Sequence, residues 1–231
     1  MIVTIHQPQF MPWLGYFDKM DQADHFVLLD NVQFKKNEWQ NRNRIKTSQG
    51  AQWLTVPVSY QFPARIDEVA TSGAVNWRNK LWQALITNYT PAGAWEENAD
   101  SIEALLGEQY TRLVDINVAS IEWIKSRLGI QTPMSLASQS QSSDDPTQRL
   151  IDLCLQHEAT TYLSGPDGEK YLDVSRFTAQ GIDVIFHSYE HPEYEQLFGG
   201  FISHLSCLDL VLNHGHASAD IVRRGRRPIL T

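Results

Sequence analysis

Residues 1–31, MIVTIHQPQFMPWLGYFDKMDQADHFVLLDN, decide the fold class. The branched apolar run at 2–5 predicts a buried strand, which ends at the His-Gln-Pro sequence of 6–8 because proline cannot extend a central strand. Residues 13–20 carry large apolar side chains at helical spacing, and 25–29 is a second apolar run. A strand, a helix and a strand in this order predict a βαβ unit, in which the two strands are parallel. Ligands of such folds bind at the carboxyl ends of the strands, where we therefore expect the functional site.

The same alternation returns in the second half of the chain. Apolar periodicity predicts helices at 76–89 and 110–128, the second ended by Gly129, and strands at 52–58 and 66–70 that pair with each other. A second alternating block follows, with helices at 147–157, 169–180 and 206–213 and strands at 160–163 and 182–186. We expect an α/β fold, a single domain over 1–231 with a mainly parallel, Rossmann-like sheet flanked by helices. The Ser/Gln-rich stretch at about 137–146 is expected to be a mobile loop.

Composition excludes several classes of protein. The 231 residues are 42% hydrophobic and 20% charged, as in an ordinary globular protein. The two cysteines, Cys154 and Cys207, form no C-x-x-C motif, which excludes a disulfide scaffold and suits a reducing cytosol. No signal-peptide pattern and no apolar run of roughly 18 residues is present, so we expect a cytoplasmic protein. The net charge of −8 disfavours nucleic acid and anionic membranes as partners.

The exit of the first strand is the leading candidate site. His6 has the chemistry of a general base or of a donor to phosphate, and Asp30, at the end of the second apolar run, is expected at the same sheet edge as a catalytic group. A glycine among these residues would let a ligand approach the backbone. The alternative for His6 is a strand-end histidine that bonds to a carbonyl. The substrate-binding residues expected around this edge are Gln7, Trp13, Gly15, Tyr16 and Gln33.

A second candidate is the positive charge of residues 35–46, which hold five basic side chains opposed by Glu38 alone. The Asn-Arg-Asn-Arg sequence of 41–44 offers planar donors that suit phosphate or carboxylate, so Asn41, Arg42, Asn43 and Arg44 are predicted to bind substrate. The alternatives are a solvated charged face and a nucleic-acid patch in which Trp39 stacks on bases.

Two further features lie at later strand ends. The turn 164–168 connects a predicted strand and helix, so Ser164, Gly165 and the nearby Lys170 are predicted to contact an anion, although the spacing is not that of a P-loop and a simple turn is the alternative. His187 follows the last predicted strand and is a candidate catalytic group. Its i, i+4 spacing to His191 is that of a helical metal pair, but a loop is expected there, and no metal ligand is assigned.

Several motifs together resemble those of the WbqC-like protein family. They are 6–17 (HQPQFMPWLGYF), 29–34 (LDNVQF), 41–46 (NRNRIK), 53–58 (WLTVPV), 162–166 (YLSGP) and 205–213 (LSCLDLVLN). The resemblance covers nearly the whole chain and implies a bacterial cytoplasmic protein of surface-polysaccharide (O-antigen) or secondary-metabolite biosynthesis. It implies transfer of an aminoacyl or other acyl group to an amino sugar. It assigns no catalytic residue.

The first strand exit is also similar, more distantly, to nucleotidylyltransferases of the HxGH type. In that superfamily a histidine at the end of the first strand contacts the nucleotide phosphates. Here Tyr16 stands where the second histidine of the motif is expected, and Ser164-Gly165-Pro166 with Lys170 matches the distal basic motif only loosely.

These observations lead to one hypothesis and two alternatives. The hypothesis is a transferase that moves an acyl or aminoacyl group onto a nucleotide-activated amino sugar, with Arg42 and Arg44 holding the diphosphate and His6 or His187 accepting the proton of the amine. The partner is then a phosphorylated or nucleotide-linked small molecule rather than nucleic acid or a membrane. The alternatives are nucleotidyl transfer, which would use Mg²⁺ as cofactor, and a non-catalytic binding or scaffold protein.

Overall fold

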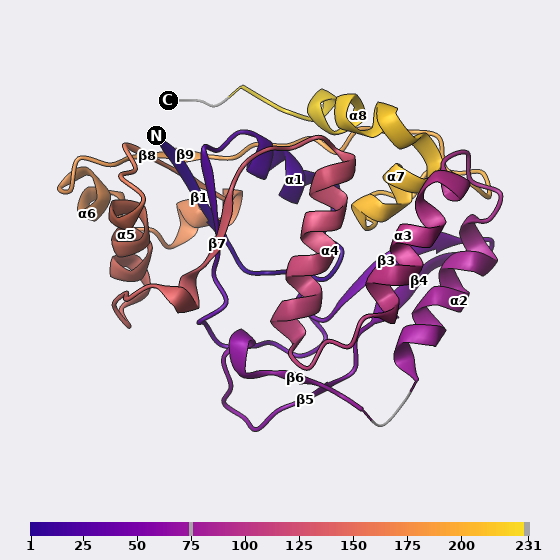
Figure 1. Cartoon of the computed structure of the whole chain (residues 1–231). Coiled ribbons are helices and arrows are strands. Elements are labelled where there is room, and N and C mark those ends of the chain that lie inside the picture. The colour runs from indigo at the N-terminus through magenta and orange to yellow at the C-terminus, as the bar shows by residue number, and fades with distance from the viewer. Residues whose placement is uncertain (74–75, 229–231) are drawn as a thin grey trace.

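The computed structural model describes residues 1–73 and 76–228, and its centre is a five-stranded parallel sheet (Figure 1). The strands are β1 (Ile2–His6), β2 (His25–Leu28), β7 (Met134–Leu136), β8 (Thr161–Ser164) and β9 (Asp183–Phe186), in the spatial order β7-β2-β1-β8-β9. Numbered by their own sequence along the chain, this order is 3-2-1-4-5. It is the doubly wound order, and the strand order reverses between β1 and β8, where such sheets bind their ligands. The α/β fold with a parallel sheet is confirmed.

Helices cover both faces of this sheet because side chains of a strand alternate between the faces. On one face, Val3 and Ile5 of β1 pack against α5 (Pro146–Gln156) and α6 (Val174–Thr178). On the other, Phe26 and Leu28 of β2 join a larger core with α1 (Leu14–Asp21) and α4 (Leu113–Arg127). Each of these helices therefore covers a face of the sheet on which the strands present apolar side chains.

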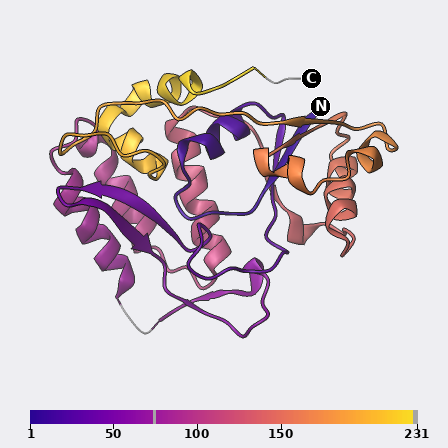
Figure 2. The same ribbon diagram turned by 180° about the vertical axis from the view of Figure 1, so that it is seen from behind.

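A long insertion between β2 and β7 builds the other side of the molecule. It contains the hairpin β3 (Arg42–Thr47) and β4 (Gly50–Thr55), the short pair β5 (Val58–Ser59) and β6 (Ala70–Thr71), and the helices α2 (Trp77–Tyr89), α3 (Trp95–Gly107) and α4. The C-terminal helices α7 (Cys207–His214) and α8 (Ser218–Arg224) return along it, with α7 against β3 and α8 against α1. Figures 1 and 2 both place the hairpin beside α7, on the side away from α5 and α6. Four single-turn 3₁₀ helices complete the described elements: 66–68, 137–139, 166–170 and 215–217.

One buried carboxylate fastens the insertion to the C-terminal segment. Asp209 of α7 accepts hydrogen bonds from Tyr89 of α2 at 2.5 Å and from Tyr194 at 2.9 Å. The Tyr89 hydroxyl in turn accepts the backbone N–H of Lys46 in β3 at 3.1 Å, and the Lys46 ammonium donates to the carbonyls of Gly199 and Gly200. Burial raises the pKa of Asp209. The hydrogen bonds that its carboxylate accepts offset the free-energy cost of burying it in the core.

The predicted helices at 76–89 and 110–128 and the predicted strands of the parallel sheet are present within a few residues of the expected bounds. Two expectations are wrong. The strand at 52–58 pairs as β4 with β3 and not with 66–70, where a 3₁₀ turn precedes β6. The region 169–180 is not one helix, because Asp173 interrupts it and caps α6 through the Ser175 N–H. Strands β3 and β7 and helix α3 were not expected.

The predicted Ser/Gln-rich loop at 137–146 begins with a 3₁₀ turn at 137–139. Ser138 binds Asp30, and Asp145 caps α5 by accepting the Gln148 N–H at 2.8 Å. Its mobility stays a prediction. In residues 1–73 and 76–228, no helix combines the length and the apolar character that a membrane crossing requires.

Replacing Tyr89 by Phe tests the carboxylate that joins the two segments. The change removes the donor to Asp209 and the acceptor of the Lys46 N–H, so we expect the free energy of unfolding to fall by about 1–3 kcal/mol in urea titrations. The control is Tyr110→Phe, since no hydrogen bond of the Tyr110 hydroxyl is found among the described residues. Equal stability of the two variants would contradict the role given to Tyr89.

Candidate functional site

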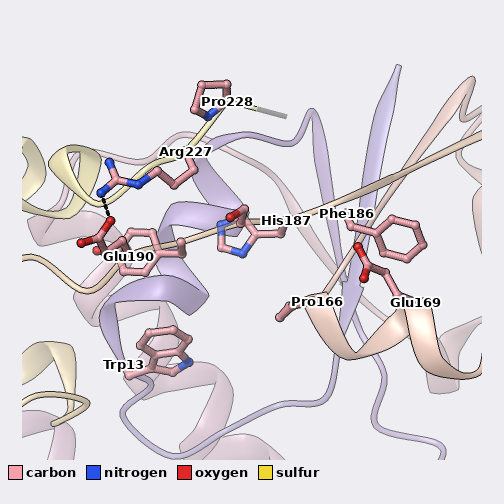
Figure 3. Close-up of a pocket in the computed structure, with 10 residues that line it drawn as sticks. Trp13, Pro166, Glu169, Phe186, His187, Glu190, Arg227 and Pro228 are labelled. Atoms are coloured by element: carbon pink, nitrogen blue, oxygen red, sulfur yellow. Dashed lines mark hydrogen bonds and ion pairs between the residues drawn. The ribbon is translucent and has the colours of Figure 1, made fainter. Parts of the chain in front are cut away.

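A cavity of about 700 Å³ opens at the carboxyl edge of the sheet, beside the point where the strand order reverses (Figure 3). His187 follows β9 directly, and its backbone N–H donates to the Ser164 carbonyl at the end of β8 at 2.9 Å. Figure 3 shows the His187 ring between Trp13 and the turn that carries Pro166 and Glu169. The cavity, called the His187 cavity below, is lined by Trp13, Pro166, Glu169, Phe186, His187, Ser188, Tyr189, Glu190, Arg227 and Pro228.

His187 is held by a buried carboxylate. Its Nε2 lies 2.8 Å from Oδ2 of Asp18, which is fully buried in α1. Arg226 donates Nε to the other oxygen, Oδ1, at 2.9 Å, and Gln22 donates to Oδ2 at 2.6 Å. A carboxylate only accepts, so Nε2 carries a hydrogen, and in the neutral ring Nδ1 then presents a lone pair. No partner of Nδ1 is found within the described ranges, which leaves this nitrogen available to a substrate proton.

His6 lies near this group but in a different state. Its ring packs edge-on against Tyr16 with centroids 4.8 Å apart, and its Nδ1 lies 3.1 Å from the Gln7 carbonyl. Burial, and then the charge of Lys19, lower the pKa of His6 to about 3. Lys19 donates its buried ammonium to the Ile5 carbonyl at 3.0 Å, and burial lowers the pKa of Lys19 to about 7. His6 is thus a neutral strand-end residue whose Nδ1 faces a backbone carbonyl, whereas the Nδ1 of His187 has no partner among the described residues.

Trp13 forms the wall between the His187 cavity and a second, smaller one. A Cβ at Gly15 would lie 2.3 Å from the Trp13 indole, so it is this ring, and not a ligand, that lies against the Gly15 backbone. The same indole stacks on His204 at 5.2 Å and meets the Tyr189 ring edge-on at 5.6 Å. With Trp39 and His204 it lines a cavity of about 220 Å³.

The predicted cationic stretch divides into an inner and an outer part. Asn43 is buried and donates to the Met11 carbonyl at 2.7 Å, while Asn41 donates to the Val56 carbonyl at 3.0 Å. Both amides therefore hold backbone in place. Arg42 and Arg44 lie outward against Trp39 and Trp53, outside the lining of the His187 cavity.

The structure separates Asp30 and Gln33 from His187. The Asp30 carboxylate is buried and accepts the backbone N–H of Ser138 at 2.8 Å and its hydroxyl at 2.6 Å, so both oxygens are occupied. Burial raises the pKa of Asp30. Gln33 is exposed and lines a separate polar cleft of about 590 Å³ with Arg65 and Arg149.

The residues predicted around the distal turn also have local partners. The Ser164 hydroxyl is buried and donates to the Gly165 carbonyl at 3.1 Å. Lys170 is exposed and pairs with Asp167 at 2.6 Å, which raises its pKa. The turn contributes Pro166 and Glu169 to the His187 cavity instead. Gln7 accepts from Gln40 at 2.7 Å, so it braces the strand exit against the insertion.

The sequence did not reveal the partners of His187. Asp18 lies 169 positions before it and Arg226 lies 39 positions after it, and no local spacing connects such residues. The basic tail of 223–227 was visible as charge, but nothing indicated that it folds against α1. The segment from His187 to His191 is a loop, as expected from Pro192, and His191 Nδ1 lies against the Pro192 carbonyl. Among the described side chains, no group of three or more His, Cys, Asp and Glu is placed to hold a metal ion.

Fold and site define the chain as an α/β protein with a carboxylate-held histidine at the carboxyl edge of a doubly wound parallel sheet. The model of the WbqC-like protein family matches residues 7–221, and the chain belongs to this family. It is 40% identical over 229 residues, 97% of this chain and 99% of the relative, to "Uncharacterized protein Rv1507c" of Mycobacterium tuberculosis (strain ATCC 25618 / H37Rv). No solved structure matches.

Gly15→Ala tests the packing of the Trp13 indole against the Gly15 backbone. The new methyl group would overlap the indole, so we expect a loss of about 1–3 kcal/mol in the free energy of unfolding. Gly107→Ala is the control, since the space in front of Gly107 at the end of α3 is open. Chemical denaturation of both variants measures the difference, and a neutral Gly15→Ala would show that Trp13 has another place to lie.

Lys19 predicts a pH dependence of stability. Its folded-state pKa of about 7 lies below the ordinary 10.5, so between these values the unfolded chain holds a proton that the folded chain does not. The free energy of unfolding of the wild type should therefore rise relative to that of Lys19→Met from pH 7 to 9, by about 1 kcal/mol per pH unit. Denaturation curves at pH 7, 8 and 9 measure this difference. A difference that stays constant over the range would mean that Lys19 remains charged in the fold.

Proposed function

We propose that this chain is a cytoplasmic transferase that moves an acyl or aminoacyl group onto the amine of a phosphorylated or nucleotide-linked amino sugar. The observation that carries the proposal is the His187–Asp18–Arg226 chain, which opens on a cavity of about 700 Å³ at the sheet edge. A histidine whose far nitrogen is fixed by a buried carboxylate is the arrangement that general-base catalysis uses in unrelated folds. The buried, unpaired state of both cysteines accords with a reducing compartment.

The lining of the cavity suits an amino sugar. Trp13 and Tyr189 offer aromatic faces, against which the apolar face of a sugar ring packs. Glu169 lines the same cavity, and a carboxylate there attracts the amino group of the sugar. Glu190 and Arg227 pair at the edge of the cavity and can hydrogen-bond to the hydroxyls of a sugar or to an anionic group.

The reaction follows from the free nitrogen of His187. The amine nitrogen attacks the carbonyl carbon of an activated acyl donor, and a C–N bond forms as the bond from that carbon to the leaving thiolate or phosphate oxygen breaks. His187 Nδ1 accepts the proton that the amine loses, and Asp18 stabilises the imidazolium that results. His187 then returns the proton to the leaving group or to water.

Two substitutions test this role. His187→Gln removes the base, and Asp18→Asn lets a side-chain amide donate to Nε2, which moves the imidazole hydrogen to Nδ1. We expect both to lower the rate of acyl transfer to a nucleotide-linked amino sugar by about 10²–10⁴-fold. Binding of the sugar nucleotide should change little, because the base contributes mainly in the transition state.

The controls are His25→Gln, at the opposite edge of the sheet, and Asp115→Asn, at the start of α4; both should keep full activity. The substrate is found first by a thermal-shift panel of nucleotide-linked sugars that carry a free or an acetylated amine, since a ligand at 100 times its Kd stabilises by about 2.7 kcal/mol. If no sugar nucleotide binds, or if His187→Gln keeps its turnover, the proposed function is wrong.

Nucleotidyl transfer is the second candidate, favoured by the doubly wound strand order with His6 at the end of the first strand. It predicts pyrophosphate release from a nucleoside triphosphate in the presence of Mg²⁺, with loss of this release in His6→Ala. The local partners of His6 and of Lys170 give the first proposal the stronger support.

A further inference from the structure

The outer face of the β3–β4 hairpin, together with Trp39 just before it, carries a row of alternating cations and indoles. The Arg42 guanidinium carbon lies 4.0 Å from the Trp53 ring centroid. The Arg44 guanidinium carbon lies 5.7 Å from the same ring and 5.9 Å from Trp39, and the two indole centroids are 5.6 Å apart. Both indoles are open to solvent, Trp39 at 38% and Trp53 at 42% exposure. These four residues are called the tryptophan–arginine row below.

The charge of this row is not neutralised by the protein. Several other arginines pair with carboxylates, as Arg112 does with Asp115 and Arg226 with Asp18, while Arg78 and Arg127 lie over indoles but bond to oxygens of the protein. Arg42 has no hydrogen-bond or ion-pair partner within residues 1–73 and 76–228, and Arg44 makes one long bond of 3.4 Å, to the His204 carbonyl. In a chain with 27 acidic and 19 basic residues, two such guanidinium groups side by side are held apart from the many available carboxylates. The Nε atoms of both groups are buried and unpaired, so apart from the long bond of Arg44 it is the terminal guanidinium nitrogens that can donate to an external anion.

The row adjoins the smaller cavity, and Trp13 stands between that cavity and the His187 cavity. Trp39 and Trp13 line the cavity of about 220 Å³ with His204, and Trp13 also lines the His187 cavity. Arg44 reaches the His204 backbone, and the His204 ring stacks on Trp13. A ligand that begins on the row would therefore have to extend past Trp13 to reach His187.

We infer that the tryptophan–arginine row binds the nucleoside diphosphate part of the substrate, with the base stacked on Trp39 or Trp53 and the phosphates on Arg44 and Arg42. A base stacks on a planar aromatic face, and a diphosphate binds guanidinium groups. A nucleoside diphosphate carries both groups in one molecule. The inference rests on the proposed function for the sugar that would extend past Trp13. It adds that the sugar is carried on a nucleoside diphosphate, and it names the surface that binds this group.

Calorimetry with UDP, dTDP, CDP, GDP and ADP, without any sugar or acyl donor, tests the inference. At least one of these should bind more tightly than its nucleoside and more tightly than pyrophosphate, because base and phosphates contact different side chains. Arg44→Gln should raise the Kd of that nucleotide about tenfold or more, which is the effect of one charge-assisted hydrogen bond.

Matched variants separate stacking from charge. Arg44→Lys keeps the charge but loses the planar fork, so its Kd should lie between those of the wild type and Arg44→Gln. Trp39→Leu should weaken binding, and Trp39→Phe should restore part of it because the aromatic face returns. Arg112→Gln removes one positive charge from a surface pair far along the chain and should leave the Kd unchanged. Circular dichroism checks that each variant is folded.

Three results would each overturn the inference. The Arg42→Gln/Arg44→Gln double variant could bind nucleotides with the Kd values of the wild type, or pyrophosphate could bind as tightly as every nucleotide. The third is that the protein binds a single-stranded oligonucleotide but no nucleoside diphosphate. Failure here differs from failure of the proposed function. His187→Gln and Asp18→Asn should bind the nucleotide as the wild type does and lose turnover. If they lose turnover while the row variants keep both binding and turnover, the transferase proposal stands and the row is not its nucleotide site.

Discussion

The buried carboxylate of Asp18 is the interaction on which the site depends. It sits in α1 and accepts from His187 beyond β9 and from Arg226 beyond α8, so it joins the beginning, the last sheet strand and the end of the chain. A carboxylate at this depth is tolerated only when its oxygens are satisfied, and removal of one partner leaves an uncompensated charge. The C-terminal segment must therefore fold against α1, and the same contact that meets this requirement fixes the tautomer of His187.

Trp13 likewise joins two parts of the molecule, the sheet and the insertion. The backbone before it is tied to α7, and the start of α7 is tied to the hairpin: the Cys207 N–H donates to the Pro12 carbonyl at 2.8 Å, and the Ser206 N–H donates to the Arg44 carbonyl at 2.9 Å. Gly15 leaves room for the indole below, and His204 covers it above. These contacts hold the hairpin at a fixed distance from the strand exit. A ligand that spans both would therefore meet two preformed surfaces, which lowers the ordering cost of binding.

The sequence predicted the parts of this arrangement that depend on local pattern. The branched run at 2–5 and the following proline predicted the first strand and the edge at which it ends, and His187 was predicted at the same edge for the same reason. The spacing of α3 is also present in the sequence, since its buried residues Trp95, Asn98, Ile102 and Leu106 recur at helical intervals. Strand β3 was hidden because its buried residues include Asn43 on one face and Lys46 on the other, whose hydrogen bonds replace the apolar alternation on which strand prediction relies.

The sequence predicted only part of the site, because the positions of charged residues in a sequence do not show which of them the fold buries and which it leaves exposed. The stretch 35–46 looked like one cationic patch, yet the fold buries Lys46, uses Asn41 and Asn43 to hold backbone, and leaves Arg42 and Arg44 on the indoles. The net charge of −8 acts over the whole surface and repels a long polyanion at every point of contact. A small dianion is shorter than a few Debye lengths of about 8–10 Å and experiences mainly the two nearby guanidinium groups. The inferred nucleotide site therefore combines two local guanidinium groups with an acidic surface, a combination that favours small anions over polymers of the same chemistry.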